Sequence, residues 1–385
     1  IVKLIEDKKI KLEDPVQRYL PWFQLKDPQI SSTITIQHLL THTSGISTYE
    51  GLALSDKQSE NSTALKENVM KLSNVKLTAP PGEKYQYSNA NYIVLGALIE
   101  AVTNETYSSY MEKYIFQPLN MNGAAASKET AYEKGYLTGY QSWFGIPRKS
   151  VVSYDNAGAP YGYITANLED MIQYIMFLNR SEHAQFLKQE NMDLYLSPLY
   201  KINSEKSYGF GLRTTNINES ETMIWHSGST PDARAEIFIL NKSGWGGVIL
   251  TNKNHVLEEP ALSVLKNGII SILNGEEPVD IPKNIPLTQI ILLIVTLILF
   301  IISFMLIKKY KHMKTAKKVI WLSIGSLSLL LSITFIPILT YSTSSPWHTI
   351  KIFASDVALF ASIIVTLLAV NGLISIFIAL RRKKV

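Results

Sequence analysis

The chain has 385 residues, no cysteine, 46% hydrophobic residues and a formal net charge of +5. This length allows one large domain or a few ordinary ones, and a charged fraction of 18% excludes a disordered, highly charged chain. The absence of cysteine excludes disulfides, thiolate metal sites and a cysteine nucleophile.

The positive charge is confined to the C-terminal part of the sequence. Residues 285–385 contain eleven Lys and Arg side chains and one acid, Asp356, so they carry +10 and residues 1–284 carry −5. A nucleic-acid-binding domain would gather basic groups on its folded surface, but the larger part of this chain is mildly acidic. We therefore expect no nucleic-acid partner.

Residues 1–274 predict one domain of mixed helices and strands. Apolar residues at helical spacing predict helices over 36–42, 62–73, 91–103, 107–116 and 165–178. Thr165 is the expected N-cap of the last of these helices. Residues 141–160, rich in Gly, Pro, Ser and Asn, predict a long loop.

Strand signals gather late in this domain. Period-2 patterns predict strands over 208–213, 222–226, 235–240 and 247–251, with a hairpin turn at 241–246. A last helix is predicted over 258–273. Helices in the middle of the chain and antiparallel strands after them predict an α+β fold.

The remaining residues predict a membrane anchor. A proline-containing linker at 275–286 precedes three uncharged apolar runs, each long enough to cross a hydrocarbon core of about 30 Å, at 287–307, 319–341 and 357–380. Lysines crowd the first connection and basic residues follow the third run, whereas the second connection has only Lys351. By the positive-inside rule, the C-terminus is cytoplasmic and the N-terminal domain is extracytoplasmic. We expect a multi-pass protein of the cell membrane, with the lipid bilayer as a partner.

Five segments in order resemble one family, the serine hydrolases related to class C β-lactamases, D,D-peptidases and penicillin-binding proteins. They are the opening IVKLIEDKKIKLEDPVQRYLPWF, HLLTHTSGI from residue 38, PG from 81 with YSNANY from 87, YGFG from 208 and HSGSTP from 226. The resemblance covers nearly all of residues 1–275. It implies an antiparallel sheet with a helical subdomain, and it implies that the early strands of that fold precede Ile1.

The resemblance also implies catalytic residues. Acyl transfer from a serine nucleophile needs a group that takes the hydroxyl proton and hands it to the leaving group. The resemblance implies Tyr87 for this shuttle, helped by a lysine, and Asn89 as a hydrogen-bond partner of the substrate amide. From residue types alone, a Ser-Asn turn before a helix is more typical of helix capping than of catalysis.

A second part of the implied site comes from the late strands. His226, Ser227 and Gly228 take the place of a Lys-Thr-Gly motif that lines the family's site, and the Ser229 N–H is one half of an implied oxyanion hole. By itself, a strand histidine is typical of a hydrogen-bonded core residue. Histidine in place of lysine weakens the fixed positive charge and puts tight recognition of β-lactams or free carboxylates in doubt.

We expect no metal or other cofactor. His38 and His42 stand four apart on a predicted helix, a spacing that could hold a metal ion. However, no H-E-x-x-H pattern and no third ligand accompany them, so a structural role is the prediction.

The family's nucleophile is the serine of an S-x-x-K motif. The opening segment aligns so that this serine falls about ten residues before Ile1, and we expect an upstream segment that carries it. Two S-x-x-K strings occur within the chain, at Ser73 and at Ser263. The first stands too close before Tyr87 and the second comes after His226, so neither is predicted to be the nucleophile.

Two functions are compatible with these patterns. The first is a membrane-anchored extracytoplasmic serine hydrolase that acts through an acyl-enzyme on cell-wall peptides, D-amino-acid esters or β-lactams. The second is a catalytically inactive binding or sensory module of the same fold. An upstream S-x-x-K motif discriminates between them, and without that motif the chain is expected to form no acyl-enzyme.

Overall fold

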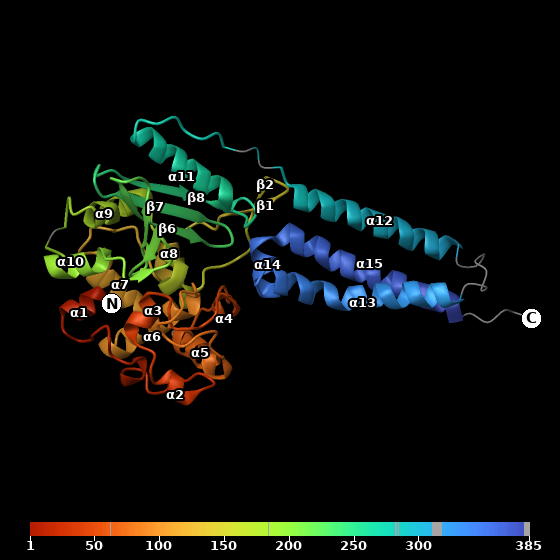
Figure 1. Ribbon diagram of the computed structural model, residues 1–385, viewed down its shortest axis with the longest axis horizontal. Coiled ribbons are helices and arrows are strands. Elements are labelled where there is room, and N and C mark those ends of the chain that lie inside the picture. The colour runs from red at the N-terminus through yellow and green to blue at the C-terminus, as the bar shows by residue number, and fades with distance from the viewer. Residues whose placement is uncertain (62, 184, 282, 284, 310–317, 381–385) are drawn as a thin grey trace, which may run out of the picture. The chain divides into compact units, whose positions relative to one another are not determined.

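The computed structural model describes residues 1–385 except 62, 184, 282, 284, 310–317 and 381–385 (Figure 1). The chain forms two compact units. One comprises Ile1–Tyr140, Lys149–Asn254 and Leu262–Asp280, and the other comprises Gln141–Arg148, His255–Ala261 and Ile281–Val385.

Most of the regular structure in the first unit is helical, and most of its helices are short. Those before the sheet are α1 (Val2–Glu6), η1 (Val16–Arg18), α2 (Pro28–Ser31), α3 (Ile36–Leu40), α4 (Thr48–Leu54), α5 (Ala64–Met70), η2 (Lys71–Asn74), α6 (Asn89–Thr103), α7 (Tyr107–Met111), η3 (Glu112–Phe116), α8 (Lys128–Glu133), η4 (Asn156–Gly158), η5 (Ala159–Tyr163), α9 (Leu168–Leu178) and α10 (Gln189–Leu196). The predicted helix over 62–73 corresponds to α5 and η2, and its residue 62 lies outside the described residues.

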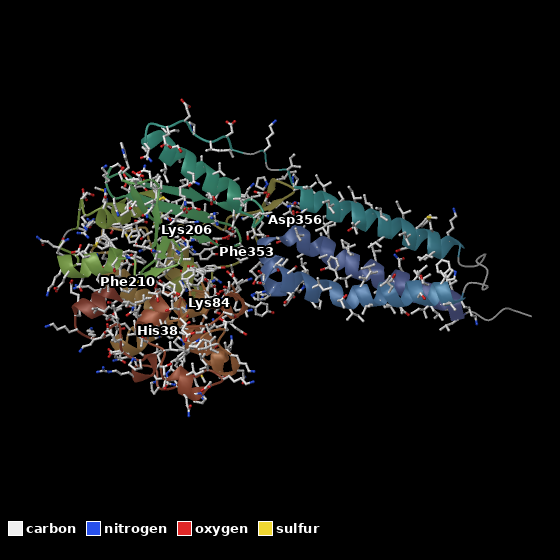
Figure 2. The ribbon with its side chains drawn as sticks, in the orientation of Figure 1. His38, Lys84, Lys206, Phe210, Phe353 and Asp356 are labelled. Atoms are coloured by element: carbon white, nitrogen blue, oxygen red, sulfur yellow. The ribbon has the colours of Figure 1, made fainter. Side chains whose placement is uncertain are left out.

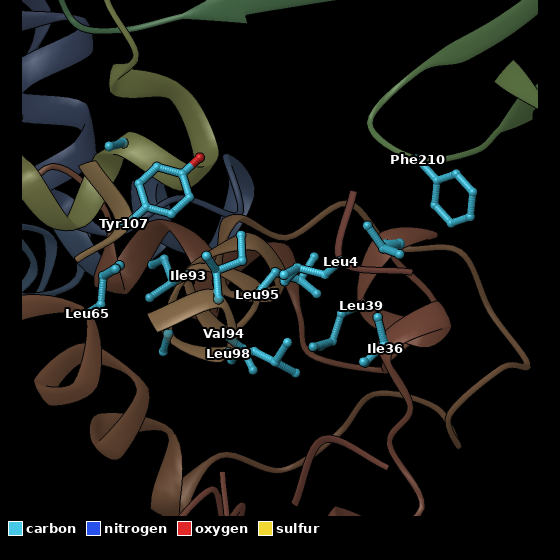
Figure 3. Packing of buried hydrophobic residues seen from close by; sticks show 14 of the residues in the cluster. Leu4, Ile36, Leu39, Leu65, Ile93, Val94, Leu95, Leu98, Tyr107 and Phe210 are labelled. Atoms are coloured by element: carbon cyan, nitrogen blue, oxygen red, sulfur yellow. The ribbon is translucent and has the colours of Figure 1, made fainter. Parts of the chain in front are cut away.

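Helix α6 forms the centre of the main core. It is apolar on almost every side, so it is buried among its neighbours rather than amphipathic. Figure 3 shows residues of α6 together with core residues from α1, α3 and α5: Ile93, Val94, Leu95, Leu98, Leu4, Ile36, Leu39 and Leu65. The opening segment and the segment from residue 38 therefore build the support for the residues that directly precede α6.

Six antiparallel strands form the main sheet, in the order β3-β4-β5-β6-β7-β8. Their bounds are β3 (Tyr200–Lys201), β4 (Lys206–Tyr208), β5 (Arg213–Asn216), β6 (Thr222–Ser229), β7 (Arg234–Leu240) and β8 (Gly246–Thr251). Helix α11 (Glu259–Leu273) covers one face, where Ile270 packs on Met223 and Phe238. On the other face, Ile224 and Ile239 join the main core. The α+β prediction is confirmed.

Two predicted segments differ from the structure. The predicted strand over 208–213 is wrong because Gly209–Leu212 form a turn between β4 and β5, in which Gly211 has φ +77°. The predicted N-cap Thr165 is also wrong. Asn167 caps α9 instead, because its side chain accepts the Asp170 N–H and the Asp170 side chain accepts the Asn167 N–H.

The predicted loop over 141–160 contains an unpredicted hairpin. Its strands are β1 (Tyr140–Trp143) and β2 (Ile146–Lys149), and Lys253–Asn254 form β9. Phe144 and Gly145 connect β1 to β2 with φ values of +52° and +85°. Two consecutive left-handed residues are the geometry of a tight hairpin turn, which a composition rich in glycine and proline does not distinguish from a loop.

The second unit contains the apolar helices. These are α12 (Leu287–Lys309), α13 (Lys318–Ser342), the short α14 (Trp347–Phe353) and α15 (Ser355–Leu380). Among the described residues, α12, α13 and α15 are long and apolar enough to cross a membrane. Helix α15 packs against both α12 and α13, and the Asn371 side chain donates a hydrogen bond of 3.2 Å to the Leu299 carbonyl of α12.

A buried polar cluster holds the second unit together at the start of α15. Phe353 ends α14 and Asp356 lies in the first turn of α15 (Figure 2). The Asp356 carboxylate accepts a hydrogen bond from His255 Nε2 at 3.0 Å and another from the Phe144 N–H at 3.2 Å. Three segments far apart in sequence therefore meet on one carboxylate.

Candidate active site

The segment that carries Tyr87 is fixed to the residues after α3. The Gln86 N–H donates to the His42 carbonyl at 2.8 Å, and the Ser88 N–H donates to His42 Nδ1 at 3.1 Å. The Tyr87 carbonyl accepts the Thr48 hydroxyl at 2.7 Å. Hydrogen bonds to the backbone of Gln86, Tyr87 and Ser88 therefore fix the position of Tyr87.

The structure brings Tyr87 and His226 together. Their ring centroids are 6.2 Å apart, although one residue precedes α6 and the other lies in β6. Burial raises the pKa of Tyr87 to about 12, against a smaller lowering by the charge of Arg213. Burial, and then the same charge, lower the pKa of His226 to about 4. At neutral pH both side chains are uncharged, so Tyr87 donates a proton more readily than it accepts one.

Asn89 is the first residue of α6. Its side-chain amide Nδ2 donates to the Ser55 hydroxyl at 3.0 Å, and that hydroxyl donates to the Gly51 carbonyl at 2.8 Å. The chain thereby fixes the orientation of the Asn89 amide. Among the described residues no donor to its Oδ1 is seen, so this atom can accept an N–H from a bound molecule.

Within the described residues, the last part of β6 pairs with a strand on only one of its two sides. Pairing of β6 with β5 ends at Trp225↔Arg213, whereas pairing with β7 continues to Ser229↔Arg234. The backbone of residues 226–229 therefore forms a short edge beside His226. Such an edge can pair with an extended peptide through main-chain hydrogen bonds.

The predicted triplet divides between the two faces of the sheet. Alternation along β6 places His226 and Gly228 on one face and Ser227 and Ser229 on the other. The Ser229 hydroxyl accepts a hydrogen bond from Asn254 Nδ2 at 2.9 Å. The His226 side chain thus lies on the face toward Tyr87, while the two hydroxyls belong to the opposite face.

Arg213 is a site residue that the sequence reasoning missed. Its guanidinium carbon lies 5.8 Å from the Tyr87 ring centroid, 5.7 Å from that of Tyr208 and 5.5 Å from that of Trp225. Arg213 Nε is buried and has no hydrogen-bond partner among the described residues. A fixed positive charge therefore stands beside Tyr87 and His226. In the sequence, Arg213 follows Leu212 and begins the strand next to β6, a position that does not by itself mark it as a site residue.

The remaining candidates have structural contacts. Lys266, which ends the S-x-x-K string of Ser263, donates to Glu236 at 3.0 Å and lies 3.7 Å from the Trp225 ring centroid. His38 Nδ1 accepts the Thr35 N–H as part of the α3 capping box. Within the described ranges, no three His, Asp or Glu side chains gather as metal ligands.

A family model described as Beta-lactamase matches residues 1–264 of the chain. The chain belongs to the Beta-lactamase family. The matched residues therefore include the main sheet, the Tyr87–His226 site and the helices before the sheet, whereas α11 continues past the match to Leu273. Helices α12, α13 and α15 lie outside the matched residues.

The sequence is similar to proteins of two other bacteria. Protein flp of Staphylococcus aureus (strain NCTC 8325 / PS 47) is 30% identical over 262 residues, which cover 66% of this chain and 50% of that protein. Penicillin-binding protein 4* of Bacillus subtilis (strain 168) is 28% identical over 297 residues, covering 73% and 63%. The chain spans about half the length of the flp proteins that it matches.

Solved structures support the fold. The octameric penicillin-binding protein homologue from Pyrococcus abyssi matches with a TM-score of 0.60 and 24% identity, over 74% of this chain and 64% of that one. The penicillin-binding protein from Bacillus halodurans matches with a TM-score of 0.56 and 22% identity, over 69% and 80%. The first unit thus has the β-lactamase and penicillin-binding-protein fold.

Proposed function

We propose that this Beta-lactamase-family protein is a membrane-anchored serine hydrolase that acts through an acyl-enzyme. The proposed nucleophile is the serine of an S-x-x-K motif upstream of Ile1. Tyr87 shuttles its proton, Asn89 accepts the substrate N–H, and the Ser229 N–H stabilises the developing oxyanion. The single observation that carries the proposal is the Tyr87 ring 6.2 Å from His226 in a fold shared with penicillin-binding proteins.

In this mechanism, Tyr87 must lose its own proton before it can accept the proton of the serine. A phenol whose pKa is raised to about 12 is a poor base at neutral pH. The lysine of the proposed S-x-x-K motif would add a positive charge beside it and favour the phenolate. Tyr87 then takes the serine proton during acylation and returns it to the leaving group, so the proton balance closes within the site.

The proposed substrates are cell-wall peptides, D-amino-acid esters or β-lactams. Two features support a peptide-like molecule with an anionic group. The 226–229 edge offers main-chain hydrogen bonds to an extended segment, and the Arg213 guanidinium, with its buried Nε, offers a charge for a carboxylate. Arg213 thereby supplies the fixed positive charge that His226 does not.

The proposed location is the cell membrane, with the first unit extracytoplasmic and the C-terminus cytoplasmic. The three apolar helices and the basic residues beside the first connection and the third helix support this orientation. A site outside the cell membrane fits substrates of the cell wall.

The test uses the protein extended by the segment that we propose to precede Ile1. That segment should contain S-x-x-K, and a fluorescent penicillin or an activated ester should label its serine and fail to label the Ser→Ala variant. The 385-residue chain alone should remain unlabelled. Absence of the motif would favour the inactive binding or sensory module, and stoichiometric labelling of Ser73 or Ser263 would contradict the assignment of the nucleophile.

A further inference from the structure

Two amide donors define the protonation of the buried His42 ring. The Ser88 N–H and the Asn91 Nδ2 reach His42 Nδ1 at 3.1 and 3.0 Å. The Ser44 hydroxyl donates to Asn91 Oδ1 at 2.6 Å and so turns the Asn91 NH₂ group toward the ring. A backbone N–H can only donate, so Nδ1 is an acceptor and the proton of the neutral His42 ring lies on Nε2.

The hydrogen bonds continue from His42 to the site. His42 Nε2 lies 3.2 Å from the Tyr208 hydroxyl, and that hydroxyl lies 3.4 Å from His226 Nε2. Because the Nε2–H of His42 donates to Tyr208, the hydroxyl oxygen accepts there and its own proton is directed to His226 Nε2. We propose that His42 and Tyr208 are positioning residues that fix His226 in the tautomer with its proton on Nδ1.

The surroundings of His42 and Tyr208 favour the uncharged forms of these hydrogen-bonded side chains. Burial lowers the pKa of His42 well below its ordinary value, with further lowering by the charges of His226 and Arg213. His42 and Tyr208 are each 1% exposed, so water does not compete for these atoms. His42 also has a left-handed backbone with φ +55°, a conformation that a non-glycine residue keeps only where its surroundings hold it.

The inference rests on the proposed function for its meaning and deepens it. If Nε2 of His226 is occupied by the Tyr208 proton, Nδ1 carries the ring hydrogen and donates, either to a ligand or in the backbone hydrogen bond that His226 makes with Ser227. A lysine ammonium also only donates. The relay through His42 and Tyr208 therefore explains how histidine serves in the place of the family's lysine.

One competing acceptor is present. Tyr208 also has a side-chain hydrogen bond with Tyr92, and the Tyr92 hydroxyl donates to the Leu40 carbonyl at 3.2 Å. If Tyr208 gave its proton to Tyr92 instead, His226 Nε2 would lose its donor. The two arrangements differ in the tautomer of His226.

The test is ¹⁵N nuclear magnetic resonance of the histidine side chains in the 385-residue chain in detergent. Signals of His42 and His226 are assigned from their His→Gln variants. We expect opposite tautomers, with the proton of His42 on Nε2 and that of His226 on Nδ1. A His226 proton on Nε2 in the unaltered chain would overturn the proposal, whatever the variants show.

Matched tyrosine variants test the role of Tyr208. Tyr208→Phe should move the His226 proton from Nδ1 to a mixture of both nitrogens, with an unchanged backbone spectrum. Tyr85→Phe is the control, because its ring centroid lies 5.4 Å from that of Tyr208 and its buried hydroxyl has no partner among the described residues. An unshifted His226 in Tyr208→Phe would contradict the relay. Because ring protons rather than turnover are measured, this failure would leave the proposed hydrolase standing.

Discussion

At the scale of single residues, Asp56 is a carboxyl group that the fold buries, although its charged form is more stable in water. It is 7% exposed and accepts the Tyr163 hydroxyl at 2.6 Å. Burial raises the pKa of Asp56 to about 6, and the negative charge of Asp155 adds to this shift. The folded protein therefore binds a proton at Asp56 more tightly than the unfolded chain does.

The raised pKa of Asp56 makes the free energy of unfolding fall as pH rises. A raised carboxyl pKa stabilises the fold most below the ordinary value near 4, and this contribution is lost as pH rises through about 6. Asp56→Asn keeps an oxygen for Tyr163 but removes the titration. At pH 7.5 we expect the variant to be more stable than the parent by about 2 kcal/mol, and at pH 4 nearly equal to it. Urea unfolding at both pH values measures this, and a pH-independent difference would contradict the assignment.

Glu236 is buried between two cations. It is fully buried, its Oε1 accepts Arg234 Nη2 at 2.9 Å, and its Oε2 accepts Lys266 Nζ at 3.0 Å. Glu236→Gln removes the negative charge and should lower the free energy of unfolding by about 3 kcal/mol. The exposed pair Arg180–Asp193 is the control, for which Asp193→Asn should cost about 0.5 kcal/mol. If both variants lost the same free energy of unfolding, burial would not explain the contribution of the Glu236 ion pairs to stability.

At the scale of elements, the start of α9 separates two candidate caps. Asn167→Ala should cost about 1 kcal/mol of unfolding free energy because it breaks the reciprocal bonds with Asp170. Thr165→Ala should cost much less, since Thr165 pairs with Ala125 through its backbone. Unfolding of both variants under one set of conditions gives the comparison, and a larger loss from Thr165→Ala would restore the cap predicted from sequence.

These elements show which structural features the sequence patterns predict and which they do not. Apolar residues at helical spacing located α6 and α9, and the length of the uncharged apolar runs located the three long apolar helices. The choice between Thr165 and Asn167 depends on which residue meets a reciprocal partner in space. The 144–145 turn was missed because Phe144 adopts φ +52°, which its residue type does not indicate.

At the scale of the whole molecule, the candidate site combines residues from distant parts of the chain. Tyr87 and His226 could be predicted because each stands in a motif whose order along the chain resembles a known family. Arg213 and the His42–Tyr208 relay could not, since they depend on the turn at 209–212 and on the packing of α3 against α6. No local pattern distinguishes Arg213 from an exposed strand arginine.

The proposed orientation in the membrane can be tested with single cysteines. The 385-residue chain has no cysteine, so an introduced thiol reports without background from these residues. A membrane-impermeant maleimide applied to intact cells should label Thr343→Cys, between α13 and α14. Lys318→Cys, at the start of α13, should be labelled only after permeabilisation. The reverse pattern would contradict an extracytoplasmic first unit.

The most direct test of the account is the rate of acylation in two tyrosine variants of the protein extended by the proposed upstream segment. Intact-mass measurement over time after addition of a penicillin gives that rate. We predict that Tyr87→Phe slows adduct formation by about a hundredfold or more, since it removes the proton shuttle, while Tyr85→Phe leaves the rate unchanged. Acylation of Tyr87→Phe at the parent rate would contradict the account.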